Sequence, residues 1–266
     1  MRVGTAGEAH SQACFTLVLT ATAVIGSTMA ARADMLINEP KLVGVGLYTV
    51  PEAARLTKVP SPTIRRWLFG YRTRRNGQYS ELPPVWESQI APIDSVTGLG
   101  FLDLMEIRFV HAFRDYGVSL NNIRLAVERA REIFRSDHPF AKKRFQTDGR
   151  RIFATVAEST GETTLIDLVK SQYAFHRVVK PSLYASLEFS DADEVLRWFP
   201  LWPKQQVVVD PEKAFGRPIV RDGHVPTDTL AQAVEAEGSM DRVAHWFDVP
   251  MQAVRAALDF EKEFAA

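Results

Sequence analysis

The segment at residues 48–75, YTVPEAARLTKVPSPTIRRWLFGYRTRR, constrains the fold of this chain more than any other stretch. Thr49 and Glu52 have the spacing of a capping box, in which each side chain accepts a hydrogen bond from the backbone amide of the other residue. A short helix is therefore expected to start at Thr49. The residues Lys58-Val59-Pro60 are expected to turn the chain after it.

A second short helix is expected directly after this turn. Ser61 is expected to cap it, and Pro62 suits its first position, where no amide hydrogen is needed. Ile64, Trp67 and Leu68 then fall at i, i+3 and i+4 and form one apolar stripe. Two short helices joined by a tight turn predict a helix-turn-helix, whose second helix reads DNA.

Positive charge is concentrated on this motif, since no acidic residue lies between residues 53 and 80. Such a one-signed cluster is the electrostatic footprint of a nucleic-acid interface. An ordinary solvated helix face is the alternative. The residues expected to contact DNA are Lys58, Ser61, Thr63, Arg65, Arg66, Arg72, Arg74 and Arg75.

The stretch at residues 71–94 is expected to form the wing of a winged helix-turn-helix. Asn76-Gly77 is a turn signal between the extended segments 72–75 and 79–82. A β-ribbon there would reach phosphates or a minor groove beside the recognition helix, and an unstructured basic loop is the alternative. Apolar spacing then predicts two core helices, at residues 101–116 and after Ser119.

The connector at residues 144–204 is expected to mix strands and a helix. Asp148-Gly149 reads as a two-residue hairpin turn between 145–147 and 152–156. One more helix is expected at residues 164–179 and short strands at 187–209. Trp198 and Trp202 lie in the last of these segments.

The C-terminal unit at residues 205–266 is expected to be trihelical, with helices at 227–237, 239–247 and 250–264. It has helix-turn-helix spacing, but it carries 6 Lys+Arg against 11 Asp+Glu, whereas residues 44–155 carry 18 against 11. Its acidic last helix should repel phosphate. We therefore expect it to bind protein or to dimerise. The expected partner-binding residues are Trp246, Phe247, Phe260 and Phe264, more large aromatic side chains than so small a core easily covers.

The first 34 residues do not fit the rest of the chain. The apolar run at residues 14–26 is too short for a membrane span, and Ala31-Arg32-Ala33 resembles a signal-peptide cleavage site. A start codon placed too far upstream, with Met29 or Met35 as the true start, is the favoured interpretation. It implies a cytoplasmic protein without a membrane segment, and a genuine export signal is the alternative.

Catalysis is not expected. The six histidines show no spacing typical of metal ligands, and the single cysteine, Cys14, excludes an intramolecular disulfide and a cysteine-built zinc site. Gly44-Val45-Gly46 lacks the third glycine of a dinucleotide fingerprint. We expect no enzyme activity, no metal and no cofactor.

The expected fold class is mainly α with small β elements (α+β), in four parts. These are an apolar leader at 1–34, a winged helix-turn-helix at 44–143, a short β/helix connector at 144–204 and a trihelical, helix-turn-helix-like domain at 205–266.

Several motifs together resemble the VapB-type antitoxins. They are GLYTVPEAARL, IRRWLFGY, HPFAKKRFQTDGRRIF, DPEKAFGRPIV, VPTDTLAQAVEAEGS and AVRAALDFE, and the resemblance covers residues 43–260. It implies a MerR-like winged helix-turn-helix followed by a C-terminal domain long filed as of unknown function. It also implies a PIN-type ribonuclease toxin as partner, binding to promoter DNA and repression of the protein's own operon. The leader departs from this pattern.

Two other functions remain open from the sequence. The first is a MerR-like transcriptional regulator that senses a small molecule in residues 144–205, where the tryptophans could line a pocket. The second is a protein-interaction adaptor that never contacts DNA. A homodimer on promoter DNA would place two half-sites about 34–36 Å apart.

Overall fold

The computed structural model describes residues 44–75, 77–90, 98–159 and 183–265. The expected leader at 1–34 and the expected helix at 164–179 lie outside these residues. Leu42–Ala266 forms one compact unit. Within the described ranges, no helix is both long enough and apolar enough to cross a bilayer.

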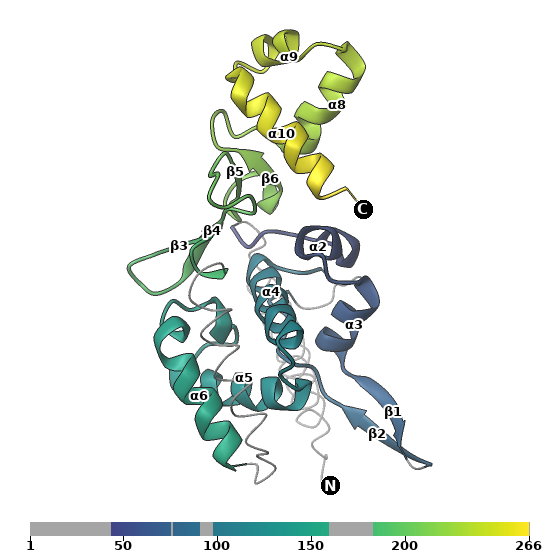
Figure 1. The fold of residues 1–266 in the computed structure, drawn as a ribbon, viewed down its shortest axis with the longest axis vertical. Coiled ribbons are helices and arrows are strands. Elements are labelled where there is room, and N and C mark those ends of the chain that lie inside the picture. The colour runs from purple at the N-terminus through teal and green to yellow at the C-terminus, as the bar shows by residue number, and fades with distance from the viewer. Residues whose placement is uncertain (1–43, 76, 91–97, 160–182, 266) are drawn as a thin grey trace, which may run out of the picture. The chain divides into compact units, whose positions relative to one another are not determined.

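The fold is mixed α+β, about half helical with small sheets, as the sequence predicts. Figure 1 shows the helices α2 (Val50–Thr57), α3 (Ser61–Phe69), α4 (Phe101–Asp115), α5 (Leu120–Phe134), α6 (Phe145–Ser159), α8 (Thr227–Glu237), α9 (Met240–Trp246) and α10 (Met251–Glu263). The strands are β1 (Tyr71–Arg75), β2 (Gln78–Leu82), β3 (Leu187–Phe189), β4 (Val195–Trp198), β5 (Val207–Val209) and β6 (Pro218–Val220). Short 3-10 turns lie at η1 (Pro139–Ala141) and η3 (Ala214–Gly216).

The helices α2 and α3 form the predicted helix-turn-helix. The Thr49 amide donates to Glu52 Oε2 at 2.7 Å and the Glu52 amide donates to Thr49 Oγ1 at 3.3 Å, which confirms the capping box. The expected cap at Ser61 is wrong, because the N-cap of α3 is Pro60. The Pro60 carbonyl already accepts the amide of Ile64 at 3.1 Å, so Ser61 lies inside the first helical turn.

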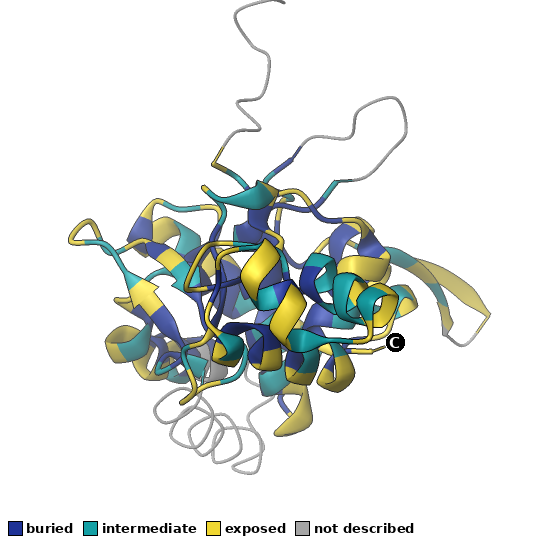
Figure 2. Cartoon of the chain, turned by 90° about the horizontal axis from the view of Figure 1, so that it is seen from above, coloured by how far each residue is buried: buried dark blue, intermediate teal, exposed yellow. Residues whose placement is uncertain are grey.

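A tight turn at Gly70 lets the β1–β2 ribbon leave α3 directly. Gly70 has a φ of 68°, and a side chain there would meet the backbone carbonyl of Leu82. The strands pair antiparallel, with Arg74 opposite Tyr79, which confirms the expected ribbon. Figure 2 shows this ribbon extending to one side with mostly exposed residues.

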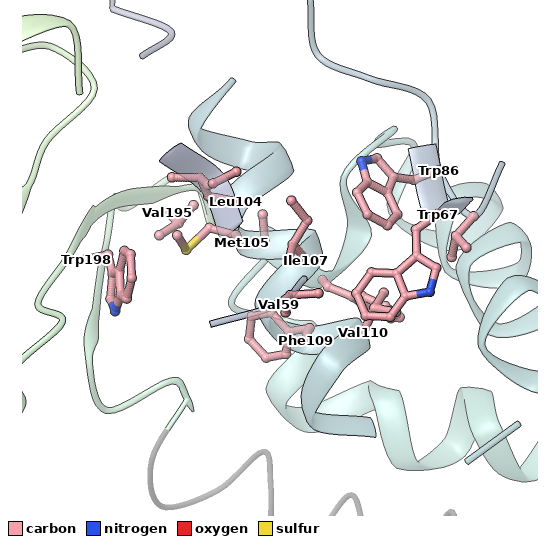
Figure 3. Close-up of a cluster of buried hydrophobic side chains, with 14 of the residues drawn as sticks. Val59, Trp67, Trp86, Leu104, Met105, Ile107, Phe109, Val110, Val195 and Trp198 are labelled. Atoms are coloured by element: carbon pink, nitrogen blue, oxygen red, sulfur yellow. The ribbon is translucent and has the colours of Figure 1, made fainter. Parts of the chain in front are cut away.

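The central helix α4 lies in the middle of the main core. In Figure 3 the side chains of Trp67 and Trp86 lie on one side of this helix, and those of Val195 and Trp198 lie on the other. All four are buried. The core therefore joins α3 to the sheet of β3–β6.

The predicted hairpin at residues 145–156 is wrong, because this stretch is helix α6. Its buried residues Phe145, Gly149, Ile152, Phe153 and Val156 follow the i, i+4, i+7, i+8, i+11 spacing of a helix face. Packing of that face against α5 outweighs the turn preference of Asp148-Gly149, since a glycine in a helix costs only about 1 kcal/mol.

The strands β3, β4, β5 and β6 form an antiparallel sheet in chain order, and they lead into the C-terminal helices. The predicted three helices are confirmed as α8, α9 and α10. Their small core contains Val220, Leu230, Val243 and Val254. Phe260 and Phe264 instead belong to the main core, with Tyr48 and Val50.

Candidate nucleic-acid interface

The exposed face of α3 carries the candidate DNA-reading residues. Ile64, Trp67 and Leu68 are buried, which turns Arg65 and Arg66 to the outside. Ser61 and Thr63, at the start of the helix, are half-buried. Because the first turns of a recognition helix reach base edges in known complexes, this face has the geometry for contact with a major groove.

The charge of this face is not compensated locally. Neither Arg65 nor Arg66 forms an ion pair with any described residue. The Arg66 guanidinium lies 5.8 Å from the centre of the Tyr71 ring, which orients it without neutralising it. No acidic residue occurs in the first turn of α3. The face therefore attracts an anionic surface.

The ribbon contributes one arginine that is free for an anion and one that is paired. Arg74 lies over the ring of Tyr79, 5.6 Å from its centre, and Tyr79 is 73% exposed. Arg72 forms an ion pair with Glu81 at 2.6 Å on the opposite strand. Its charge is thus partly compensated by an acid that lies just beyond residue 80. Arg75 is the last residue of β1, and its side chain is not among those that the structure describes.

Sequence reasoning missed Tyr79 as part of this surface. Its position opposite Arg74 follows from the antiparallel register of β1 and β2. Residues 78–81 of β2 are all exposed, so the available signal was one large aromatic residue among polar neighbours on this strand.

Lys58 faces the C-terminal helices rather than open solvent alone. It is the left-handed C-cap of α2, with φ 58°. Its Nζ lies 3.5 Å from Glu263 Oε1 and 4.7 Å from the centre of the Phe264 ring. Both the Lys58 and the Glu263 side chains are more than half exposed, so the pair is weak and open to competition by phosphate.

A second ion pair joins the same two elements. Arg55 Nη1 on α2 lies 3.0 Å from Glu261 Oε2 on α10, and both side chains are largely shielded. The other Glu261 oxygen accepts a hydrogen bond from Thr227 Oγ1 at 2.6 Å. Part of the acidic face of α10 therefore binds the basic side of the first helix-turn-helix.

The four expected partner-binding aromatic residues divide into two groups. Phe260 and Phe264 are buried and stack on each other, with ring centres 4.5 Å apart. These two are not available at the surface, because the core of the helix-turn-helix domain covers them. Trp246 is 60% exposed and Phe247 is partly exposed, so these two remain available to a partner.

Several ionisable side chains are buried in the domain that carries α3 and the ribbon. Asp103 on α4 is fully buried and accepts hydrogen bonds from Trp86 Nε1 at 2.9 Å and from the Gly100 amide at 2.8 Å. It thereby fixes the loop that follows the ribbon. Nothing in the sequence pattern distinguishes this aspartate from an exposed one.

Two titratable side chains near Asp103 have shifted pKa values. Burial raises the pKa of Glu106 well above its ordinary value, although the amides of Phe140 and Ala141 donate to its Oε1. Burial lowers the pKa of His138, whose Nδ1 lies 4.0 Å from Asp103 Oδ1. Both groups therefore favour their neutral forms in the folded chain.

The described residues contain no cluster of three or more His, Cys, Asp and Glu side chains that could hold a metal ion. His111 and Asp115 pair at 3.4 Å on α4 as an ordinary helix-surface pair. Trp198 is buried against the Arg108 guanidinium, whereas Trp202 borders a hollow of about 240 Å³ beside α10. The two tryptophans therefore do not share the sensor pocket suggested for residues 144–205.

Two family models match this chain. One, described as "Putative DNA-binding HTH domain", covers residues 46–127, which contain α2, α3 and the ribbon. The other, described as "Protein of unknown function (DUF433)", covers residues 207–260.

Two curated proteins of Mycobacterium tuberculosis are similar to the chain. "Putative antitoxin VapB45" is 28% identical over 226 residues, which cover 81% of this chain and 93% of that protein. "Uncharacterized protein Rv2308" is 24% identical over 242 residues, covering 88% of this chain and 96% of that protein.

A solved structure shares the fold. The crystal structure of Rv2018 from Mycobacterium tuberculosis aligns with a TM-score of 0.61 at 24% identity, and it covers 81% of this chain and 99% of that one. Together, the comparisons support an antitoxin-like helix-turn-helix protein, with a DNA-binding domain followed by a domain of unknown function.

Proposed function

We propose that this chain is the antitoxin of a type II toxin-antitoxin system and represses its own operon. In this role it binds promoter DNA through a MerR-like winged helix-turn-helix and neutralises a PIN-type ribonuclease toxin. It acts in the cytoplasm as a homodimer, without catalytic activity or a cofactor. The similarity to an antitoxin and the matching DNA-binding family model support this proposal.

The single observation that carries the DNA-binding part is the uncompensated cationic face of α3. Arg65 and Arg66 are exposed, lack ion-pair partners among the described residues and lie on a helix whose opposite face belongs to the main core. An arginine that binds guanine with two hydrogen bonds contributes about 1–3 kcal/mol of discrimination against the wrong base. The ribbon beside this face, with Arg74 and Tyr79, would contact the phosphate backbone.

The parts of the chain then have separate tasks. Residues 44–143 read the promoter, residues 144–204 connect, and residues 205–266 bind the toxin. A ribonuclease must present a basic groove to its RNA, so the acidic balance of the C-terminal part, 6 Lys+Arg against 11 Asp+Glu, suits such a partner.

The test is binding of the protein to its own promoter DNA after replacement of Arg65 and Arg66 by alanine. We expect the double variant to lose affinity at least about tenfold, since each arginine supplies about 1–3 kcal/mol. Arg129→Ala is the matched control, because Arg129 is exposed on α5 and pairs with Glu132 at 2.7 Å. Unchanged promoter binding by the double variant would show that α3 is not the recognition helix.

A further inference from the structure

The C-terminal unit repeats the helix-turn-helix of the N-terminal one, residue for residue. Residues 49–68 align without a gap to residues 239–258, each one 190 positions later. The identical pairs are Ala54 and Ala244, Val59 and Val249, Pro60 and Pro250, Arg65 and Arg255, and Leu68 and Leu258.

The first helix of each pair begins in the same way. The Thr49 side chain caps α2 by accepting the amide of Glu52 at 3.3 Å. The Ser239 side chain caps α9 by accepting the amide of Arg242 at 3.4 Å. The two caps therefore occupy equivalent positions and bind equivalent amides.

The turns between the helices also match. Lys58 has φ 58° and Asp248 has φ 50°, so both residues adopt the left-handed conformation that non-glycine residues rarely take. Val59 and Val249 follow them, and both are buried. The same unusual backbone at the same position is strong support for a structural repeat.

The second helix of each pair begins at an exposed proline. The Pro60 carbonyl accepts the amide of Ile64 at 3.1 Å, and the Pro250 carbonyl accepts the amide of Val254 at 3.4 Å. Ile64 and Val254 are both completely buried. Helix α10 thus takes the place of the recognition helix α3, as their positions after α9 and α2 in Figure 1 illustrate.

The residues proposed to contact DNA are mostly not retained in the second copy. Asp248 replaces Lys58, Met251 replaces Ser61, Ala253 replaces Thr63 and Ala256 replaces Arg66, while Arg255 retains the place of Arg65. An aspartate at the turn repels phosphate, and alanine and methionine cannot bind it. The second copy has therefore kept the fold without the chemistry of DNA binding.

The second copy exposes an apolar surface at a place that the first copy buries. Leu56 of the first copy is 3% exposed, whereas its equivalent Trp246 is 60% exposed. Phe247, the next residue, and Met251, at the start of α10, are partly exposed. A large exposed tryptophan flanked by apolar side chains is typical of a protein-binding anchor.

The charges around this surface favour a basic occupant. Asp241 and Asp248 are exposed and form no ion pair with a described residue. Arg242 lies 3.8 Å from Glu237, which offsets its charge. The exposed cation that remains on α10 near the turn is Arg255. The acids at the other end of α10 are not part of this surface, since Glu261 binds Arg55.

We propose that the second helix-turn-helix is a protein-binding copy, which docks a basic partner protein on the exposed surface of α9 and the start of α10. Trp246, Phe247 and Met251 form the apolar centre of this docking face, and Asp241 and Asp248 form its acidic rim. The inference rests on the proposed antitoxin function, which supplies a basic ribonuclease as the partner. It places the partner on α9 and the start of α10, rather than on Phe260 and Phe264.

The experiment co-expresses the full chain with the products of the reading frames that adjoin its gene, and measures their affinity for each variant. We expect Trp246→Ala to weaken the complex at least about tenfold, as loss of a central anchor does. Asp248→Lys, which restores the first copy's charge, should also weaken it. Trp246→Phe should retain most of the affinity. The matched control is Trp202→Ala, since Trp202 is also exposed, at 41%, but lies outside the docking face.

The possible results test the docking face and the antitoxin function separately. If the wild-type chain binds none of these products, the antitoxin function is wrong. The proposed basic partner of the docking face is then wrong as well. If the wild type retains one and Trp246→Ala retains it equally well, only the docking face is wrong. A variant that loses dimerisation or promoter affinity while keeping the partner would assign the face to a second copy or to DNA, and would overturn the proposal.

Discussion

The two helix-turn-helix copies share their caps, turns and buried valines, but they differ at most of their exposed positions. Thr49 and Ser239 bind equivalent amides, while Lys58 and Asp248 have opposite charges on the same backbone. The buried and capping residues determine the fold, because their loss costs stability. The exposed residues are free to change, and they determine what each copy can bind.

The copies also differ in what lies beneath them. The first rests on α4 and a large core, in which Asp103, Glu106 and His138 are buried. The second has a small aliphatic core of its own, and Phe260 at its end belongs to the core of the first. The second copy is therefore expected to depend on the first for part of its stability.

The largest expected effect concerns Phe260. Phe260→Ala should destabilise the protein by about 3–5 kcal/mol, because the side chain is completely buried and its loss leaves a cavity. Trp246→Ala, in the exposed centre of the docking face, should change stability by only about 0.5 kcal/mol or less. Urea unfolding followed by circular dichroism measures both. Equal losses of stability for the two variants would mean that Phe260 does not anchor the second copy in the core of the first.

The second expected effect is a pH dependence that arises in the core beneath the first copy. Burial lowers the pKa of His138, so the folded chain resists the proton that the unfolded chain binds below about pH 6.5. Stability due to this group is present above that pH, and it is lost as the pH falls towards the lowered pKa, by at most about 1.4 kcal/mol per pH unit.

His138→Phe should flatten the stability profile between pH 7 and pH 5. His245→Phe on α9 serves as the control, because His245 is exposed. Thermal unfolding at several pH values would reveal the difference. A profile that His245→Phe flattens as much as His138→Phe would contradict this assignment.

The third expected effect tests the equivalence of the caps. Thr49→Ala and Ser239→Ala should each cost about 1 kcal/mol, because each leaves one helix amide without its side-chain acceptor. Ser61→Ala should cost less, since Ser61 lies within α3 and does not cap it. Denaturant titration of the three variants measures these losses of stability. Clearly different losses for Thr49→Ala and Ser239→Ala would mean that the two caps are not equivalent.

The smallest expected effect concerns the contact between the copies. Glu263→Gln removes the acid that lies 3.5 Å from Lys58, so Lys58 becomes freer to bind phosphate. Promoter affinity should rise by less than about 1 kcal/mol, and the rise should shrink with added salt. Arg129→Ala again provides the baseline. A fall in affinity would mean that Glu263 positions Lys58 for DNA instead of competing for it.

Local signals in the sequence were enough to predict most helices and the ribbon. Capping and apolar spacing predicted α2, α4, α5 and the three C-terminal helices, because these features act within a few residues. The hairpin expected at Asp148-Gly149 failed because packing of α6 against α5 overrides a two-residue turn preference. Ser61 failed as a cap because Pro60 starts the helix one position earlier.

The candidate sites were harder to predict where they depend on distant parts of the chain. The local pattern identified Arg65 and Arg66 as exposed, since their neighbours form an apolar stripe. It could not reveal that Phe260 is buried in the same core as Tyr48, or that Lys58 lies against Phe264. Those contacts join residues about 200 positions apart, and no helical spacing encodes them.

The hydrogen bond of Tyr48 can form only late in the synthesis of the chain. Its hydroxyl donates to the carbonyl of Gly216 at 2.6 Å, and the two residues are 168 positions apart. A ribosome adds about 5–20 residues per second, so Gly216 is made roughly 10–30 s after Tyr48. The first helix-turn-helix is therefore synthesised before Gly216, the hydrogen-bond partner of Tyr48, exists. A nascent chain that ends before residue 216 contains α3 but lacks this hydrogen bond, and only longer chains can form it.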